Sequence, residues 1–503
     1  MTMDWNFDGR ALLWLGALAL AGCGDDGATP PPDAGPVSTD DGGPGTLDGA
    51  PGDMAPVDMG PESFRIDPTG HRGTRLRRMF DAAGDDALRA VRWYDNELRV
   101  ACEPGEAADG AIRCLPMEGE AEVLFADASC TDPVLYTAAC SWSEARSRFD
   151  DRFYRATATV FEPGDGPLYG GEDCSAVAVD EDGEYRRAEV MPSESFVRFE
   201  PRTEARADGL EAIMGDGEDG SLATLAIRNV ERDYECLFDE EGRCLPGTFE
   251  RSLPFQPLFA DAGCTDRVYG HWRGPLQPKM LQDILYADDL CIARIEFFER
   301  GERAEITGMW TRNFDGDCVV QMFDTSRFDA YRPGAPIDLA TIPQARMERV
   351  GTGRLQVNHW VDSEGTPLVS REEWWDSELE RECTVYSMDG SGDDFGCVPT
   401  RSANVADGRT ADPTCSEDIP VALTDRCDEP VQLIQRDGYS CSAPWLESIG
   451  GAWLRGREVP DGQYYTSRSG GVCQAIGSDA STAVYEAGAD VFDAIPRLGW
   501  SLE

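Results

Sequence analysis

A motif that recurs three times along the chain constrains its fold more than any other feature. The shared pattern is C-[LV]-P, a variable insert, and then A-D-x-x-C-[TS]-[DE]. It occurs at residues 114–116 with 126–132, at residues 244–246 with 260–266, and at residues 397–399 with 411–417. Self-similarity at a long period predicts a repeat architecture, in which copies of one supersecondary unit pack against each other.

The register of the copies extends upstream of this motif. Residues 93–98 (WYDNEL) match residues 374–379 (WWDSEL). In both segments the Asp lies seven positions before a cysteine, which is Cys102 in the first copy and Cys383 in the third. In the middle copy Asn229 stands at the position of the Asp, which argues against a reaction that needs this carboxylate in every copy. The copies have a period of about 140 residues and are assigned to residues 64–202, 203–344 and 345–503.

The local pattern predicts an all-β fold. Runs such as LRAVRWYD, FYRATATVF and RIEFFERG are short, partly alternating and rich in β-branched and aromatic residues, as strands are. Asp-Gly pairs such as Asp109-Gly110 and Asp219-Gly220 lie between them and predict tight turns. Helical periodicity is scarce, and residues 278–287 are the best candidate for a short helix.

Roughly eight predicted strands per copy fit two architectures. In the first, each copy supplies two four-stranded blades and the three copies close into a six-bladed propeller-like array. In the alternative, the copies form three tandem β-sandwich domains. The junctions between copies are short and no long flexible spacer separates them, which favours continuous packing and the propeller-like arrangement.

Seventeen cysteines without a C-x-x-C pair indicate a disulfide framework made in an oxidising compartment, and not zinc ribbons. Cysteines that face each other across a hairpin can meet disulfide geometry. Three pairs flank predicted turns, and the hairpin bonds predicted from them are Cys102–Cys114, Cys236–Cys244 and Cys383–Cys397. The sequence does not assign disulfide partners to the other cysteines of the repeats, which are Cys130, Cys140, Cys174, Cys264, Cys291, Cys318, Cys415, Cys427, Cys441 and Cys473.

The N-terminus predicts export and lipid attachment. Residues 11–22 form an apolar run that is too short to span a bilayer and that suits a signal peptide at residues 1–22. The run ends in L-A-G-C, which resembles the lipobox of bacterial lipoproteins and predicts that Cys23 is the lipid-bearing first residue of the mature protein. Residues 23–63 are rich in Gly, Pro, Ala and Asp and predict a disordered acidic tether.

Charge and residue types exclude several classes of site. The formal net charge of −49 disfavours nucleic acid and electrostatic docking on anionic lipid. His71, His271 and His359 share no repeat position, which argues against histidine triads and histidine-rich zinc sites. The acidic clusters lack the spacing of an EF-hand, so we interpret them as solvated turns rather than calcium sites. We therefore predict no metal and no cofactor.

The remaining candidate positions are polar or aromatic. Asp127, Asp261 and Asp412 recur within A-D-x-x-C and keep a weak claim to function, although a turn or capping role for each carboxylate is favoured. Trp374 and Trp375 can stack on a sugar or an apolar ligand, but alternation along a strand places one of them in the core.

The lipobox, the acidic tether and the repeated motif together resemble a group of uncharacterised bacterial cell-envelope lipoproteins. The likeness covers nearly the whole chain and implies no catalytic residue. We therefore expect a lipid-anchored envelope protein, with the outer membrane as the favoured location. We expect it to act as a binding or structural module whose partner is an envelope protein or a glycan. The alternative is an envelope hydrolase that acts on polysaccharide through acidic residues. Calcium-dependent adhesion through the acidic turns is a third hypothesis.

Overall fold

The computed structural model describes residues 70–502 with short gaps. The gaps are residues 84–86, 118–120, 138–143, 148, 163–165, 172, 180–182, 248–250, 253–257, 273–276, 287–291, 307, 313–316, 322–327, 389–393, 416–418, 426–429, 440–446, 461, 469–471 and 477–481. The described residues lie in one compact unit, residues 59–503. The predicted signal peptide, Cys23 and the tether lie outside the described residues, as do Cys140, Cys291, Cys427 and Cys441.

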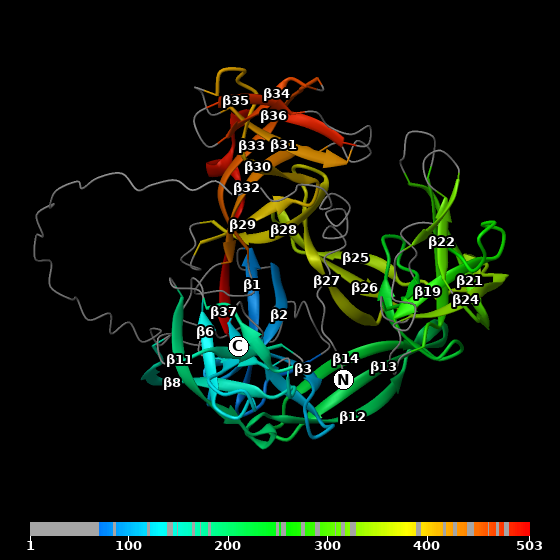
Figure 1. Ribbon diagram of the computed structural model, residues 1–503. Coiled ribbons are helices and arrows are strands. Elements are labelled where there is room, and N and C mark those ends of the chain that lie inside the picture. The colour runs from blue at the N-terminus through cyan, green and yellow to red at the C-terminus, as the bar shows by residue number, and fades with distance from the viewer. Residues whose placement is uncertain are drawn as a thin grey trace, which may run out of the picture. The chain divides into compact units, whose positions relative to one another are not determined.

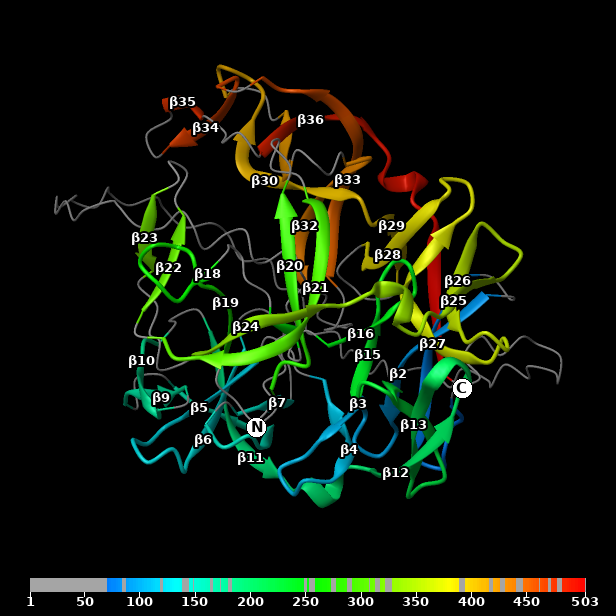
Figure 2. The same cartoon turned by 90° about the vertical axis from the view of Figure 1, so that its right-hand side faces the viewer.

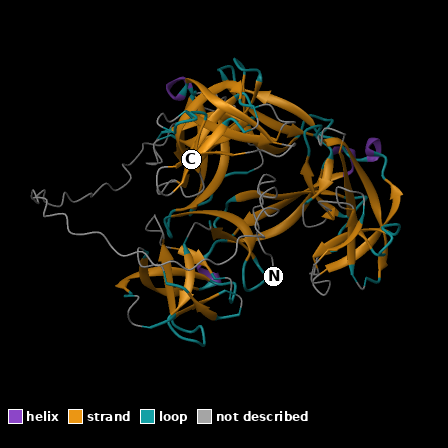
Figure 3. Cartoon of the chain, turned by 45° about the horizontal axis from the view of Figure 1, so that its top comes forward, coloured by secondary structure: helices purple, strands orange, loops and turns teal. Residues whose placement is uncertain are grey.

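Strands dominate the described part of the chain, which contains no α-helix (Figure 3). The all-β prediction is therefore confirmed. The short 3-10 helices are η3 (Ser193–Ser195), η4 (Ala207–Gly209), η7 (Leu339–Thr341) and η8 (Phe492–Ala494).

The helix predicted at residues 278–287 is wrong, because this segment contains strand β20 (Met280–Tyr286). Four successive residues of β20, from Met280 to Asp283, are buried, so both faces of the strand are covered. A strand that is buried on both faces does not show period-two alternation, and its pattern resembles that of a buried helix.

Three five-stranded core sheets correspond to the three copies of the repeat. Core sheet one contains β37 (Arg497–Leu502), β1 (Leu76–Ala83), β2 (Ala87–Asp95), β3 (Val100–Glu106) and β4 (Ile112–Pro116). Core sheet two contains β12 (Arg198–Ala205), β13 (Leu210–Gly217), β14 (Leu222–Asn229), β15 (Tyr234–Phe238) and β16 (Cys244–Pro246). Core sheet three contains β25 (Arg346–Val350), β26 (Leu355–Val361), β27 (Pro367–Asp376), β28 (Arg381–Ser387) and β29 (Phe395–Pro399).

Strand pairing runs from each core sheet to the next and returns to the first. The fifth strand of each sheet meets the first strand of the next, or the segment just before it: β4 with β12, β16 with the segment before β25, and β29 with β37. Equivalent amides make this junction, with Cys114 donating to Val197 and Cys397 donating to Pro496 at 2.9 and 3.0 Å. The C-terminal β37 also pairs with the N-terminal β1 (Figure 1). The copies therefore share strand pairing, and closure of this kind removes unpaired edges.

The buried cores show the same cyclic order. A cluster around Trp93 of sheet one includes Phe199 and Ala223 of sheet two. A cluster around Leu210 of sheet two includes Trp360 of sheet three. The third cluster joins Trp374 of sheet three to Ala87 and Leu498 of sheet one. Each core sheet thus shares apolar burial with both of the others.

A second group of strands is inserted in each copy between the fifth core strand and the next core sheet (Figure 2). Insert one contains β5 (Glu122–Phe125), β6 (Pro133–Thr137), β7 (Glu144–Arg146), β8 (Phe153–Val160), β9 (Leu168–Gly170), β10 (Ser175–Val177) and β11 (Glu184–Met191). Insert two contains β17 (Arg251–Ser252), β18 (Leu258–Phe259), β19 (Arg267–Trp272), β20, β21 (Ile292–Ala304), β22 (Met309–Arg312), β23 (Cys318–Gln321) and β24 (Phe328–Pro336). Insert three contains β30 (Ser402–Thr410), β31 (Pro420–Asp425), β32 (Gln432–Tyr439), β33 (Glu447–Glu458), β34 (Tyr464–Arg468), β35 (Val472–Ile476) and β36 (Thr482–Asp490). The six-bladed arrangement stays a prediction.

Disulfide bonds staple both parts of each copy. The structure contains the three hairpin bonds that cysteine spacing predicts, Cys102–Cys114, Cys236–Cys244 and Cys383–Cys397, with Cα–Cα distances of 5.3, 4.7 and 5.3 Å. Each joins the fourth and fifth strands of a core sheet. A second bond lies in each insert, and these bonds are Cys130–Cys174, Cys264–Cys318 and Cys415–Cys473.

Candidate functional site

The repeated carboxylate of A-D-x-x-C accepts hydrogen bonds from its own turn in all three copies. Asp127 accepts the backbone N–H groups of Thr131 and Asp132 at 2.7 and 3.0 Å. Asp261 accepts the equivalent two amides at 2.8 and 2.6 Å. Asp412 accepts the amide and the hydroxyl of the residue two positions further on. The three carboxylates are thus used as turn acceptors, as the structural interpretation of the sequence predicts.

This turn presents the cysteine of the second disulfide. Cys130, Cys264 and Cys415 have φ values of 50, 52 and 50°, in the left-handed region that non-glycine residues rarely adopt. In each copy the cysteine amide donates to the backbone oxygen of the motif Asp at 3.1 Å. The side-chain and backbone oxygens of one Asp therefore hold the backbone in the conformation that the disulfide requires. The recurrence of the motif follows from this structural role.

The hydrogen bonds also set the charge state of these carboxylates. The hydroxyls of Ser129 and Thr131, together with two backbone amides, hold the pKa of Asp127 well below its usual range. The amide of Asp266 and the hydroxyl of Thr265 lower the pKa of Asp261 to about 2. A general acid must carry a proton near the working pH, so neither group suits that role.

We expect the turns to lose stability in acid. The folded-state pKa values of Asp127 and Asp261 lie below the unfolded value of about 3.9, so the stabilisation from these two turns is present above pH 4 and disappears as the pH falls through the folded-state values. A triple variant, Asp127→Asn with Asp261→Asn and Asp412→Asn, should therefore show a shallower fall of melting temperature between about pH 5 and pH 2. Glu189→Gln, which changes an exposed carboxylate outside the turns, is the control. Parallel curves for the triple variant and the parent would contradict the assignment.

A buried ion pair occupies the second repeated acidic position. Asp95 and Asp376 are fully buried, and each binds an arginine in a forked geometry. Arg75 Nε and Nη2 lie 2.8 and 2.6 Å from the two oxygens of Asp95. Arg354 Nε and Nη2 lie 3.0 and 2.8 Å from the oxygens of Asp376.

Copy two lacks both members of this pair. Gly209 precedes Leu210 at the position of the arginine, and the buried Asn229 replaces the Asp. Asn229 Nδ2 instead lies 3.3 Å from the hydroxyl of Tyr234, which donates to the backbone oxygen of Cys244 at 2.9 Å. A buried carboxylate without a cationic partner is strongly unfavourable, so loss of the arginine and replacement of Asp by Asn go together. The pair is structural.

The paired tryptophans divide between the two faces of core sheet three. Trp374 is fully buried in the core beneath β26, whereas Trp375 is partly exposed on the opposite face. The guanidinium of Arg349 lies 3.5 Å from the ring centroid of Trp375, at cation–π distance. Arg349 therefore covers one face of the ring that a sugar would use.

Glu382 is a half-buried carboxyl on that side of the sheet. Burial raises its pKa, while the guanidinium of Arg371, 2.9 Å away, opposes this rise. Arg371 also binds Glu373 at 3.1 Å. The side-chain amide of Asn358, which is almost fully buried, lies 3.4 Å from Glu382.

The histidines do not come together. His71 pairs with Leu222 through the backbone, His271 lies on β19, and His359 Nδ1 lies 3.2 Å from the hydroxyl of Ser370. No group of three or more His, Cys, Asp or Glu side chains suited to a metal ion occurs among the residues that the structure describes.

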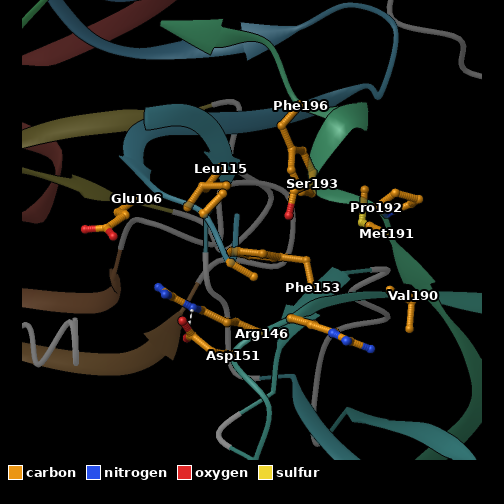
Figure 4. Close-up of a pocket in the computed structure, with 13 residues that line it drawn as sticks. Glu106, Leu115, Arg146, Asp151, Phe153, Val190, Met191, Pro192, Ser193 and Phe196 are labelled. Carbon is orange, nitrogen blue, oxygen red and sulfur yellow. Dashed lines mark hydrogen bonds and ion pairs between the residues drawn. The ribbon is translucent and has the colours of Figure 1, made fainter. Parts of the chain in front are cut away.

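A cavity of about 180 Å³ lies where insert one meets the β3–β4 hairpin (Figure 4). Its apolar wall is formed by Leu115, Phe153, Met191 and Phe196, each at most 7% exposed. Arg146 and Asp151 face each other beside this wall, with Nε 2.7 Å from Oδ1. The cavity thus combines an apolar interior with a charged rim.

The comparisons with known proteins do not indicate a biochemical activity for this chain. The profile of a family of unknown function (DUF7481) matches residues 56–268. No curated protein matches the chain, and no solved structure matches it. The matched region spans copy one, including the cavity and the Cys102–Cys114 hairpin, and ends just after the second A-D-x-x-C motif.

The sequence did not predict the cavity. Its walls come from three separate segments, the β3–β4 hairpin, β7 with the start of β8, and the end of β11 with η3. The C-[LV]-P motif in the first of them predicts a core residue at Leu115 and gives no sign of a cavity. The available signal was the end of β11, where the apolar Val190 and Met191 and then Pro192 precede a segment that recurs before each core sheet.

Proposed function

We propose that the chain is a lipid-anchored cell-envelope protein that acts as a binding or structural module, with Cys23 as the site of lipid attachment. The lipobox-like L-A-G-C sequence and the acidic tether after it support the anchor. The disulfide-stapled strands support an extracytoplasmic location, since such bonds persist in oxidising compartments.

One observation carries the preference for a module without catalysis. The polar side chains that recur between copies bind other groups of the protein. Asp127, Asp261 and Asp412 accept hydrogen bonds within the disulfide turns, and the buried carboxylates of Asp95 and Asp376 pair with arginines. Recurring positions of a multi-copy enzyme would be expected to keep polar groups directed at a substrate. The recurrence here is accounted for by folding.

The proposed partners are the membrane, through the N-terminal lipid, and an envelope protein or glycan. Among the described residues, no helix is long and apolar enough to cross a bilayer. In this proposal the lipid on Cys23 holds the protein at the membrane, and the outer membrane is the favoured location.

Replacement of Cys23 tests the anchor. Wild-type protein is expected to sediment with outer-membrane vesicles, and Cys23→Ala is expected to move to the soluble extracytoplasmic fraction, because the only proposed membrane attachment is lost. Mass spectrometry of the wild-type N-terminal peptide should show a diacylglyceryl group on the Cys23 sulfur. A Cys23→Ala protein that stays with the membranes would refute the anchor.

The envelope hydrolase remains the alternative, and Glu382 is the observation that favours it. A half-buried glutamate with a raised pKa resembles a general acid, and Glu373 and Trp375 are close to it in the sheet. We place it second because Arg371 binds both carboxylates as a counter-ion. Release of reducing ends from an envelope polysaccharide, abolished by Glu382→Gln, would reverse this order.

A further inference from the structure

Each insert contains a hairpin whose outer strand lies at an edge of its sheet (Figure 2). The hairpins are β9–β10 in copy one, β22–β23 in copy two and β34–β35 in copy three. Among the strands that the structure describes, β10, β23 and β35 each pair with their hairpin neighbour alone. We call β10, β23 and β35 the edge strands.

The edge strands lack the features that usually protect an exposed edge. None of their residues is charged, although charged residues make up 28% of the chain. They contain no proline, and no bulge interrupts their pairing with the neighbouring strand. Charges, prolines and bulges are the means by which natural proteins prevent an edge from adding another strand. The edge strands are short, at three to five residues, but they remain competent to accept a strand.

An aromatic residue lies beside each edge strand at an equivalent position of the repeat. On one side it pairs with the residue that directly precedes the A-D of the motif. On the other side it pairs with a residue of the edge strand, and these pairs are Tyr169–Ala176, Trp310–Val320 and Tyr465–Ala475. The aromatic side chains are partly exposed, and the residues opposite them are exposed, Val320 by 58%. Each hairpin therefore presents an aromatic and apolar strip next to its edge.

The second disulfide of each copy attaches the edge strand to the A-D-x-x-C turn. One cysteine of each bond belongs to the turn, and the other lies within the edge strand or directly before it, as Cys174, Cys318 and Cys473. A strand of this length with one neighbour is held by few hydrogen bonds, so the covalent bond helps to keep it on the sheet. The recurring motif thus places an edge strand and its aromatic strip in all three copies.

An extended segment of another protein suits these edges better than a second copy of this chain. The formal net charge of −49 makes two copies repel each other. The same charge attracts a basic segment at long range, and the edge strands carry no charge that opposes its approach. Backbone hydrogen bonds of an added strand supply affinity, and its side chains at alternate positions contact one face of the hairpin.

We propose that the edge strands bind extended, basic segments of an envelope protein by strand addition, with apolar residues of the segment against the aromatic strip. This inference rests on the binding role proposed above and selects a protein, and not a glycan, as the partner. The fractionation of Cys23→Ala tests the anchor independently, so the two proposals can fail separately.

Hydrogen exchange of the full-length protein, read by mass spectrometry, tests strand addition with a capped peptide of alternating lysine and valine. Near saturation the peptide is expected to slow exchange in β10, β23 and β35 at least about fivefold and to leave the other strands of the inserts unchanged. An analogue with serine in place of valine, and one with glutamate in place of lysine, should each bind at least about fivefold more weakly at low salt. Absence of protection in the edge strands, or equal binding by either analogue, would overturn the proposal.

Added lysines distinguish the edges from general attraction of a basic peptide to an acidic protein. The triple variant Ala176→Lys, Val320→Lys and Ala475→Lys should weaken peptide binding at least about tenfold, because charge on an edge opposes strand addition. Its melting temperature should not change, since the three positions are exposed. The control carries three lysines at exposed apolar positions outside the edge strands and should bind as the parent does; it is Val160→Lys with Val230→Lys and Leu454→Lys.

Two outcomes of these variants would contradict the proposal. Equal loss of binding in the two triple variants would show that the peptide responds to charge and not to the edges. Dimers of the parent in sedimentation velocity, abolished by the edge variant and kept by the control, would make a second copy of this chain the partner.

Discussion

Removal of β37 is expected to destabilise the whole chain and not only its C-terminal copy. Truncation after Pro496 deletes the strand that pairs with both β1 and β29 and removes Leu498, which is 6% exposed in the core that sheets one and three share. Loss of a buried leucine side chain alone costs about 2–5 kcal/mol, and two strand edges lose their partners in addition. We expect a decrease of at least about 3 kcal/mol in the free energy of unfolding, measured by urea denaturation.

Two substitutions separate the strand from its side chain. Leu498→Ala should cost about 2–5 kcal/mol and leave the pairing of β1 intact, whereas Leu454→Ala, at a side chain that is 49% exposed, should change stability by less than about 0.5 kcal/mol. A truncated protein that unfolds with the same midpoint as the full chain would show that β37 does not close the sheet.

The second large effect concerns the buried ion pair of copy three. Arg354→Ala should lower the free energy of unfolding by about 2–4 kcal/mol, because it leaves the fully buried Asp376 without its counter-ion. Adding Asp376→Asn should recover most of that loss, since Asn229 occupies the equivalent position in copy two without an arginine. A double-mutant cycle by urea denaturation measures the coupling.

An exposed pair provides the matched control. Arg198 lies 3.1 Å from Glu200, and their side chains are 52 and 73% exposed, so Arg198→Ala should cost less than about 0.5 kcal/mol. Asp376 Oδ1 also accepts the backbone N–H groups of Glu378 and Leu379 at 3.0 and 3.2 Å, and the amide oxygen of Asn can still accept both. If Asp376→Asn makes the Arg354→Ala protein still less stable, the unpaired charge is not the cause of the loss, and the interpretation of this repeat position as an ion pair fails.

The class of fold and the hairpin staples could be predicted from the sequence because both depend on local patterns. Alternating residues and Asp-Gly turns indicate strands and hairpins, and Gly110 and Gly220 adopt φ values of 76 and 86° as tight turns require. Cysteines on either side of such a turn have one obvious partner. The division of Trp374 and Trp375 between the two faces of the sheet could also be predicted, since successive residues on a strand point to opposite faces.

The closure and the second disulfides could not be predicted because they join segments that are distant in the sequence. Nothing local in the last residues indicates that β37 pairs with β1, more than 400 positions earlier. Cys130 has several possible partners, and only the fold selects Cys174, 44 residues away. The strand at β20 was mistaken for a helix for a related reason, since other segments cover its two faces: Met280 packs in the cluster around Leu210, and Leu281 packs with Tyr269 and Tyr331.

The cavity was missed because its chemistry is divided among segments that are individually unremarkable. Leu115 belongs to the C-[LV]-P motif, where it reads as a core residue, and Arg146 and Asp151 read as one more surface ion pair. The walls of the cavity come from the β3–β4 hairpin, from β7 with the start of β8, and from the end of β11 with η3, so only the folded chain brings them together.

Native-state hydrogen exchange of the full-length protein, read by mass spectrometry, tests most directly whether the three copies form one closed body. Peptides from β1, β13 and β26 occupy equivalent second positions in the three core sheets. The closed arrangement predicts that their most protected amides exchange with one common free energy of opening, and that truncation after Pro496 lowers all three together. Three different opening free energies, with truncation affecting β1 alone, would contradict it.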